Sequence, residues 1–311
     1  MNIILLGAAG FIGANLVKAL AGDETNNITV VDRNRANIEA VRRMNYHNVR
    51  FIETELTTDT DFAGILKDGE AVYHLISTTV PSTSNRHIGA ELQENIIVSS
   101  NLFDACVKVG VKKVIFISSG GTVYGREAAC PLREDAQTNP ITAYGIQKVT
   151  IEKLLYLYNY MYGIDYRIIR LSNPFGPYQR TDGVQGAVST FIYRALKGED
   201  VTVYGDGSAV RDYIYIDDAV RGIINIAKGA GEYSIYNLGS GCGTAIKELI
   251  SVIENTLNLK MKVVYKEARK VDVPVNYLDI SRYESCYGPL EPVSLAEGIG
   301  RTAEFMRREM L

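Results

Sequence analysis

The stretch Ile3-Ile-Leu-Leu-Gly7-Ala-Ala-Gly10-Phe-Ile-Gly13 joins a short apolar run to a loop with three glycines. The apolar run predicts a buried strand over 3–6, and the residues after Gly10 predict a helix over 11–21. Glycine permits a tight turn and a close approach of backbone to pyrophosphate, and a helix N-terminus offers free N–H groups to an anion. A glycine-rich turn with no ligand is the alternative. The stretch favours a parallel α/β fold that binds a dinucleotide through this loop.

The same alternation of strand and helix patterns continues through the first half of the chain. Further β-branched or apolar runs predict strands over 28–31, 49–52, 71–75, 114–117 and 166–171. Helical patterns fall between them at 36–43, 91–109 and 142–161. Strands that alternate with helices indicate parallel βαβ units, and continuously apolar strands indicate a sheet covered on both faces. The predicted fold class is therefore α/β, with a doubly wound (Rossmann) parallel sheet.

The rhythm changes after Asn173-Pro-Phe-Gly-Pro177. Shorter strands are predicted over 201–204, 213–216, 234–237 and 262–265, mixed with helices near 187–197, 217–228, 244–257 and 293–308. We expect a Rossmann domain over 1–173, with returns from about 212–240. Residues 174–311 should form a smaller mixed α/β lobe that binds the substrate.

Composition excludes several classes of partner. The formal charge of −3 provides no broad basic surface for nucleic acid. No apolar stretch reaches the roughly 20 residues of a membrane helix. The four scattered cysteines contain no Cys-x-x-Cys pair, and the three histidines have no ligand spacing with them. We therefore expect a cytoplasmic protein with reduced thiols and no metal.

Asp32 ends the second predicted strand, about 20 residues after the glycine loop, where a carboxylate can accept from a ribose 2′-hydroxyl. The same carboxylate repels a 2′-phosphate, so the sequence favours NAD over NADP as cofactor. Arg33 follows directly, and its guanidinium could instead bind a phosphate.

Tyr144 and Lys148 lie four residues apart on the predicted helix 142–161, so their side chains share one face. A nearby ammonium favours the ionised phenol and should lower its pKa, which would make Tyr144 a usable acid and base. The same spacing also arises by accident on many helices.

With these residues in place, the chain resembles the extended short-chain dehydrogenase/reductase family, in its branch of NAD-dependent nucleotide-sugar epimerases and dehydratases. The resemblance runs from Met1 to at least Pro274. It rests on the glycine loop, Asp32, Tyr144 with Lys148 and five further motifs, which are Tyr73-His-Leu75, Ser118-Ser-Gly-Gly-Thr-Val-Tyr-Gly125, Arg170-Leu-Ser-Asn-Pro-Phe-Gly176, Val203-Tyr-Gly-Asp-Gly207 with Arg211-Asp-Tyr213, and Asn237-Leu-Gly-Ser240.

The resemblance implies which residues bind the cofactor. Tyr144 would be the acid/base, and Lys148 would hold the nicotinamide ribose. Glu55 and Leu56 stand where the family usually has an aspartate near the adenine. The implied cofactor-binding set is Gly7, Gly10, Phe11, Ile12, Gly13, Asp32, Arg33, Glu55, Leu56, Leu75, Ile76, Ser77, Thr79, Asn95, Ser118, Tyr144, Lys148 and Ser172.

The resemblance also implies a substrate set in the smaller lobe. Arg211 and Arg269 would clamp the diphosphate, since a planar guanidinium matches paired phosphate oxygens. Pairing of Arg211 with Asp206 or Asp212, and a solvated strand end for Arg269, are the structural alternatives. The implied substrate-binding residues are Thr78, Thr122, Asn173, Val188, Tyr204, Arg211, Arg269 and Asp272.

One departure affects the catalytic hydroxyl. Alignment on Val123-Tyr-Gly125 places Gly120 where the family has a serine, so Ser119 or Thr122 should contact the reacting sugar oxygen, with Thr122 favoured. The Asp-Glu pair of the dehydratases is replaced by Gly121-Thr122, which leaves no additional carboxylate for dehydration.

The resemblance therefore implies epimerisation at C4 of a UDP-hexose through a transient 4-keto sugar. The alternatives are an NAD(P)H-dependent nucleotide-sugar 4-ketoreductase, a 4,6-dehydratase or, in another class, a non-catalytic NAD-binding redox sensor. Hexose and N-acetylhexosamine stay open, because the choice depends on pocket volume around 78–84, Gln185 and Asn276.

The aromatic stretch Leu154-Leu-Tyr-Leu-Tyr-Asn-Tyr-Met-Tyr162 is apolar on nearly all sides of its predicted helix. Core packing is one explanation. A homodimer face, formed by helices 91–109 and 142–161, is the other.

Overall fold

The computed structural model describes residues 1–81, 83–182, 186–269 and 272–311. Its contacts divide the chain into two units. The first unit consists of Met1–Ser118, Thr142–Ile169 and Ala230–Ile235. The second consists of Ser119–Ile141, Arg170–Gly229 and Tyr236–Leu311. Each unit is described by itself below.

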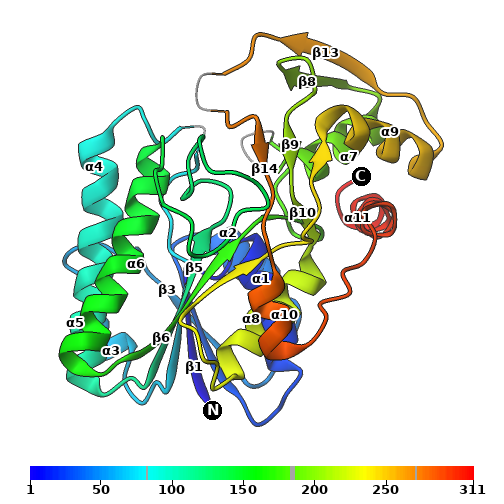
Figure 1. Ribbon diagram of the computed structural model, residues 1–311. Coiled ribbons are helices and arrows are strands. Elements are labelled where there is room, and N and C mark those ends of the chain that lie inside the picture. The colour runs from blue at the N-terminus through cyan, green and yellow to red at the C-terminus, as the bar shows by residue number, and fades with distance from the viewer. Residues whose placement is uncertain (82, 183–185, 270–271) are drawn as a thin grey trace. The chain divides into compact units, whose positions relative to one another are not determined.

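The main sheet has seven strands in the described part of the chain, in the order β11-β6-β5-β4-β1-β2-β3 (Figure 1). Strands β1 and β4 are neighbours although β2 and β3 separate them in sequence, and β1 pairs in parallel with both β2 and β4. The strand bounds are β1 Asn2–Leu6, β2 Asn27–Asp32, β3 Val49–Glu53, β4 Ala71–His74, β5 Lys113–Ser119, β6 Asp165–Leu171 and β11 Ile235–Leu238. The predicted doubly wound parallel sheet is thereby confirmed.

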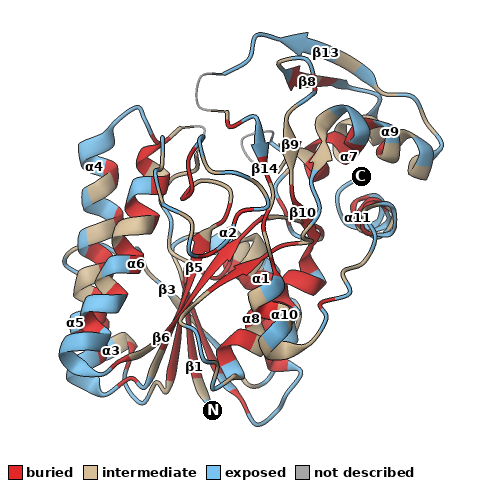
Figure 2. Cartoon of the chain, viewed as in Figure 1, coloured by how far each residue is buried: buried red, intermediate tan, exposed pale blue. Residues whose placement is uncertain are grey.

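Helices cover this sheet because its strands are apolar on both faces. Figure 1 shows α5 and α6 on one side of the sheet and α1 on the other. Leu102 and Phe103 of α5, Leu155 of α6 and Phe116 of β5 belong to one buried cluster, and Figure 2 shows the strands buried along most of their length. The helices of the first unit are α1 Phe11–Ala21, α2 Arg35–Arg42, α3 Phe62–Ile65, α4 Ile88–Leu92, α5 Val98–Val109 and α6 Ala143–Tyr162.

The helix expected over 91–109 is divided in two. A π-helical turn, η1 (Gln93–Ile97), separates α4 from α5. Such a turn inserts one extra residue into a helix and often marks a functional position. Asn95 lies within it and is buried.

The second unit holds short strands and five helices in its described residues. Its small sheets pair β10 (Tyr213–Tyr215) with β7 (Asn173–Phe175), β13 (Lys262–Lys266) with β8 (Asp200–Tyr204), and β9 (Val210–Arg211) with both β12 (Thr244–Ala245) and β14 (Val275–Asn276). The helices are α7 Ala187–Lys197, α8 Ile216–Lys228, α9 Ile246–Leu257, α10 Ser281–Tyr287 and α11 Leu295–Glu309.

The aromatic stretch of α6 is split between core and surface. Leu155 and Tyr158 are buried, whereas Tyr156, Tyr160 and Met161 are 61%, 77% and 57% exposed. Core packing therefore explains only part of this stretch. No helix among the described residues has the length and apolar character needed to cross a membrane.

Candidate active site

The three glycines of the loop differ in the space that a side chain would have. Gly7 and Gly13 are crowded by backbone atoms, whereas Gly10 is not. Gly7 has a φ of 71°, and a Cβ there would lie 3.1 Å from the backbone of Ile76. A Cβ on Gly13 would lie 2.3 Å from the carbonyl oxygen of Ala8, so only glycine fits there. In contrast, no atom lies within 4 Å of a Cβ on Gly10. Gly10 also begins α1 without any side-chain cap. The loop therefore leaves space and uncapped N–H groups where a dinucleotide phosphate would bind, and these residues fit NAD.

The Asp32 carboxylate, at the end of β2, is held by two backbone N–H groups. One carboxylate oxygen accepts the Ala9 N–H at 2.9 Å, and the other accepts the Asn34 N–H at 2.9 Å. Arg33 forms a 2.6 Å ion pair with Glu55, and both side chains are more than half exposed. The guanidinium that could have bound a 2′-phosphate is thus paired with a carboxylate, which agrees with NAD.

The loop after β4 is fixed by a chain of hydrogen bonds in the first unit. Asn95 accepts the Thr78 N–H at 3.1 Å and donates to the Thr78 hydroxyl at 2.8 Å. His74 Nδ1 accepts the Ile76 N–H at 3.3 Å, and its Nε2 lies 2.8 Å from Ser99 Oγ. Burial lowers the pKa of His74 to about 3, so the ring is neutral and Nε2 carries the proton. Asn95 thus positions the loop from the π-helical turn.

The start of α6 is capped by three side chains. Asn85 Oδ1 accepts the N–H of Ala143 at 2.8 Å, Ser84 Oγ that of Tyr144 at 3.1 Å, and Thr142 Oγ1 that of Gly145 at 3.1 Å. The first N–H groups of a helix have no partner within it, so these caps fix the position of the first turn.

Tyr144 and Lys148 lie together on α6 as their spacing predicts. Lys148 Nζ lies 5.5 Å from the centre of the Tyr144 ring and donates to the Ile117 carbonyl at 2.9 Å. Burial lowers the pKa of Lys148 to about 8, and the nearby Glu152 opposes that shift. Burial raises the pKa of Tyr144 to about 12. The expectation that the phenol pKa is lowered is therefore wrong, because desolvation of the buried Tyr144 ring dominates.

Glu152 lies one turn after Lys148 and is itself buried. Its Oε1 accepts the Ser118 hydroxyl at 2.6 Å. Ser118, predicted to bind cofactor, thus holds a buried carboxylate next to the Lys148 ammonium.

The hydroxyl loop 119–123 belongs to the second unit. A Cβ on Gly120 would lie 2.6 Å from Leu278 Cδ1 and 3.1 Å from the Arg170 carbonyl oxygen, so the family serine would require Leu278 to shift. Thr122 Oγ1 is buried and makes no hydrogen bond with any residue that the structure describes. Ser119 Oγ and Asn173 Oδ1 each lie 3.9 Å from the position of a Cβ on Gly121, so these two side chains flank it. A buried hydroxyl without a partner is available to a ligand, which supports Thr122.

The implied diphosphate clamp forms a charged group in the second unit. Arg269 contacts Asp272 through Nε at 3.0 Å and Nη2 at 3.3 Å, and its guanidinium lies 4.2 Å from the centre of the Tyr204 ring. Arg211 is partly buried, and burial lowers its pKa while Tyr213 and Asp272 oppose the shift. Its Nη1 donates to the Val210 carbonyl. Asp206 and Asp212 instead accept from Ser208 and Ser240.

The remaining predicted residues are placed as follows. Phe11 and Ile12 form the first turn of α1, and Leu56 and Ile76 pack against the buried cluster. Leu75 donates its N–H to the Leu6 carbonyl, Ser77 Oγ donates to the Thr79 carbonyl, and Thr79 Oγ1 accepts from Gln147. In the second unit, Ser172 Oγ is buried without a partner, Val188 is buried in α7 and Asn276 Nδ2 donates to the Gly120 carbonyl. Gln185 lies outside the described residues.

Sequence reasoning missed the residues that hold these groups. Ser84, Asn85, Glu152 and His74 carried no assigned role, although Glu152 continues the i, i+4 spacing of Tyr144 and Lys148. No group of three or more histidine, cysteine, aspartate or glutamate side chains could hold a metal ion among the residues that are described.

Comparisons with known proteins identify the family of the chain. Residues 3–239 match the model of the NAD dependent epimerase/dehydratase family. The chain is 31% identical to the UDP-glucose 4-epimerase of Mycolicibacterium smegmatis, over 99% of each chain. It is 29% identical to the dTDP-4-dehydro-6-deoxyglucose reductase of Escherichia coli, over 98% of each. The crystal structure of UDP-glucose 4-epimerase from Thermotoga maritima with UDP-glucose matches with a TM-score of 0.92 and 34% identity, covering 100% of both chains.

A match over most of the chain, together with an open glycine loop, Asp32 and the Tyr144–Lys148 pair, identifies an enzyme with NAD as its cofactor. The chain belongs to the NAD-dependent epimerase/dehydratase family.

Proposed function

We propose that this protein interconverts the C4 epimers of a UDP-hexose, or of its N-acetyl form, through a transient 4-keto sugar. One observation carries the proposal. Tyr144 stands on a capped helix turn with Lys148 Nζ 5.5 Å from its ring, in the same unit as the open glycine loop. The similarity to UDP-glucose 4-epimerases over the full chain supports it.

In the proposed reaction, Tyr144 Oη accepts the proton of the C4 hydroxyl and later returns a proton to the reduced C4 oxygen. NAD, which the glycine loop and Asp32 would hold, would supply the hydride transfer at C4. Lys148 donates to the nicotinamide ribose and, while protonated, stabilises the phenolate. Thr122 Oγ1, which has no other partner, donates to the C4 oxygen. Ser172 Oγ would face the nicotinamide.

Residues of the second unit would bind the nucleotide. Arg211 and Arg269 would hold the diphosphate, Asp272 the nucleotide ribose, and Tyr204 and Val188 the base. Asn173 would contact the diphosphate, and Thr78 of the first unit the sugar. The cluster of Arg269, Asp272 and Tyr204 supports this assignment, because the Arg269 guanidinium stacks on Tyr204 and interacts electrostatically with the partly buried Arg211.

The dehydratase alternative is weaker for a chemical reason. Removal of water needs an acid and a base beyond the phenol, and the segment 119–123 contains no carboxylate. The ketoreductase alternative keeps the same Tyr144 and Lys148, and the similarity to the E. coli reductase favours keeping it as the second candidate. A reductase would exchange NAD(P)H in each cycle, whereas an epimerase regenerates its cofactor.

The experiment that separates these functions supplies no cofactor. Purified protein is incubated with UDP-glucose or UDP-N-acetylglucosamine, and the C4 epimers are resolved by anion-exchange chromatography. An epimerase converts the UDP-sugar into its C4 epimer with the NAD that it already holds, so no added cofactor is needed. Conversion of a 4-keto sugar only when NAD(P)H is added would favour the reductase, and Tyr144→Phe with unchanged cellular function would favour a redox sensor.

We also propose a homodimer in the cytoplasm. The exposed apolar face of α6, which includes Tyr156, Tyr160 and Met161, supports self-association beside α5. The four cysteines are all free thiols, which suits a reducing compartment.

A further inference from the structure

Tyr124, Arg170 and Asn237 belong to the sequence motifs, have no role in the proposed chemistry and are hydrogen-bonded to one another next to the hydroxyl loop 119–123. Tyr124 Oη donates to Asn237 Oδ1 at 2.6 Å and accepts from Arg170 Nη1 at 3.1 Å. The Arg170 guanidinium also lies 5.0 Å from the centre of the Tyr124 ring. All three side chains are at least 95% buried, and all belong to the second unit.

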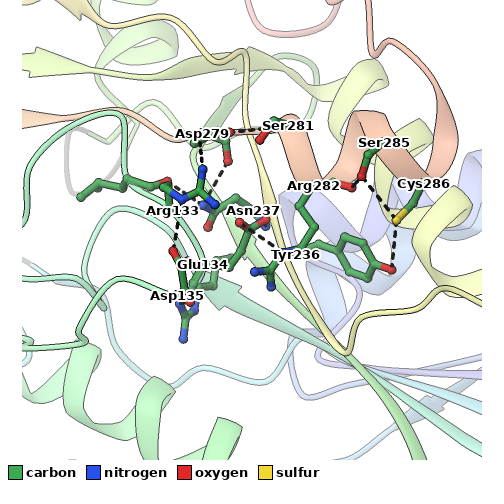
Figure 3. A network of polar contacts seen from close by, with 12 residues as sticks. Arg133, Glu134, Asp135, Tyr236, Asn237, Asp279, Ser281, Arg282, Ser285 and Cys286 are labelled. Atoms are coloured by element: carbon green, nitrogen blue, oxygen red, sulfur yellow. Dashed lines mark hydrogen bonds and ion pairs between the residues drawn. The ribbon is translucent and has the colours of Figure 1, made fainter.

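Asn237 is immobilised on every side. Its N–H donates to Glu134 Oε1 at 2.9 Å, and its side-chain amide donates to the carbonyls of Leu132 and Asp279 at 2.7 and 3.2 Å. Glu134 Oε2 lies 3.5 Å from Arg282 Nε. Figure 3 shows Asn237 between Glu134 and Asp279, with Arg282 beside Glu134. Arg170 is held as well, since it donates to the Glu134 carbonyl at 3.1 Å. Tyr124 is therefore bonded to a fixed frame.

The loop 119–123 is held by hydrogen bonds at its two ends, whereas the Thr122 hydroxyl within it is not. The Gly120 N–H donates to the Leu171 carbonyl at 2.8 Å, and the Gly120 carbonyl accepts from Asn276 at 3.2 Å. At the other end, Tyr124 is anchored by the frame. Thr122 lies between these points in the chain, and its Oγ1 makes no hydrogen bond within the described part of the chain. The position of the Thr122 hydroxyl therefore depends on its neighbours in the chain.

We propose that Tyr124 is a positioning residue, whose hydroxyl bonds to Asn237 and Arg170 fix the loop that aims Thr122 at the reacting sugar oxygen. The inference rests on the proposed function. Tyr124 does not touch the sugar itself and acts only through Thr122. A hydroxyl that is off by about 1 Å contributes much less to the reaction, although the substrate still binds.

The experiment is a double-mutant cycle with Tyr124→Phe and Thr122→Ala in the NAD-containing enzyme. Y124F removes one oxygen and keeps the ring. We expect kcat to fall about 10-fold or more, with KM for the UDP-sugar and the bound NAD within about 2-fold of wild type. Because Tyr124 acts through Thr122, Y124F should change kcat by less than about 2-fold in the T122A background.

Tyr236→Phe is the matched control for Y124F, because Tyr236 is also a buried tyrosine and precedes Asn237 in the chain. Its hydroxyl contacts Cys286 Sγ at 3.9 Å and Tyr287 Oη at 3.4 Å, away from the loop. Y236F should lower Tm without lowering kcat. Should Y124F fail to fold, Arg170→Lys takes its place in the cycle, because lysine keeps the charge but lacks the planar group that donates to Tyr124 and packs on its ring.

Wild-type kcat in Y124F, or an equal loss of kcat in the wild-type and T122A backgrounds, would overturn the positioning role. A wild-type protein that interconverts no C4 epimers would instead overturn the proposed function, so the two failures are distinguishable.

Discussion

Ser84 Oγ accepts the backbone N–H of Tyr144 at 3.1 Å, so a buried serine outside α6 sets the position of the phenol. Ser84→Ala leaves that N–H without its cap, which costs about 1 kcal/mol of stability. We expect Tm to fall by a few degrees and kcat to fall several-fold. Calorimetry and the epimer assay measure the two effects. Thr83→Ala is the control, since the Thr83 hydroxyl donates to the Val80 carbonyl at 3.3 Å within its own turn. Unchanged kcat in S84A would contradict this role.

Thr122 and Ser119 compete for the place of the family serine. The unpartnered Thr122 Oγ1 favours Thr122. We expect Thr122→Ala to lower kcat about 100-fold or more, in the range of a lost transition-state donor, while Ser119→Ala stays near wild type. Steady-state kinetics of both variants decide, and the reverse order would transfer the role to Ser119.

The ion pair between Arg33 and Glu55 should affect the relative affinities for NAD and NADP. Both side chains are more than half exposed, so the pair contributes at most about 1 kcal/mol. Glu55→Gln frees Arg33 for a 2′-phosphate, and the affinity for NADP should rise up to about 5-fold while that for NAD holds. Titration calorimetry of the cofactor-free protein measures both Kd values, with the exposed Glu53→Gln as control. An unchanged ratio of the two Kd values would show that Asp32 alone determines the choice.

His74 predicts a pH dependence of stability. Its pKa falls from 6.5 to about 3 on folding, so the unfolded chain binds more protons between these values. Stability must therefore decrease as the pH falls below 6.5. Relative to His74→Asn, the wild type should lose roughly 2 kcal/mol between pH 6.5 and 5, at 1.36 kcal/mol per unit. Urea unfolding at each pH measures this, with the exposed His87→Asn as control. Parallel curves for wild type and H74N would refute it.

The exposed tyrosines of α6 predict a dimer. Tyr160 is 77% exposed, and Tyr160→Glu introduces a charge that a buried interface would have to desolvate. We expect a wild-type dimer and a monomeric Y160E in analytical ultracentrifugation. Tyr265→Glu, at a tyrosine that is 56% exposed on β13, should leave the dimer intact. A monomeric wild type would contradict the proposed dimer interface.

The sequence predicted the regular elements because their signals are local. The helices 11–21 and 187–197 have the predicted bounds, and the first six strands lie within two residues of theirs. The tight turn at Gly7, Gly10 and Gly13 was predicted from the glycine motif alone. The π-helical turn was not predicted, since one extra residue in a helix leaves no compositional sign.

The supports of the site could not be predicted, because they join distant residues. Ser84 and Asn85 cap α6 across 60 and 58 residues, and Asn237 meets Tyr124 across 113. The direction of the Tyr144 pKa shift was wrong for the same reason. Burial depends on all the elements packed around the ring, whereas the i, i+4 spacing shows only the nearby charge.

The contact between Gly120 and Leu278 restricts which substitutions this chain can accept one at a time. A serine introduced at 120 would press against a leucine that is fully buried, so it would meet resistance before it could help the reaction. A smaller residue at 278 would first leave a cavity without benefit. The effect of a serine at 120 should therefore depend on the residue at 278, so the two positions are expected to be energetically coupled.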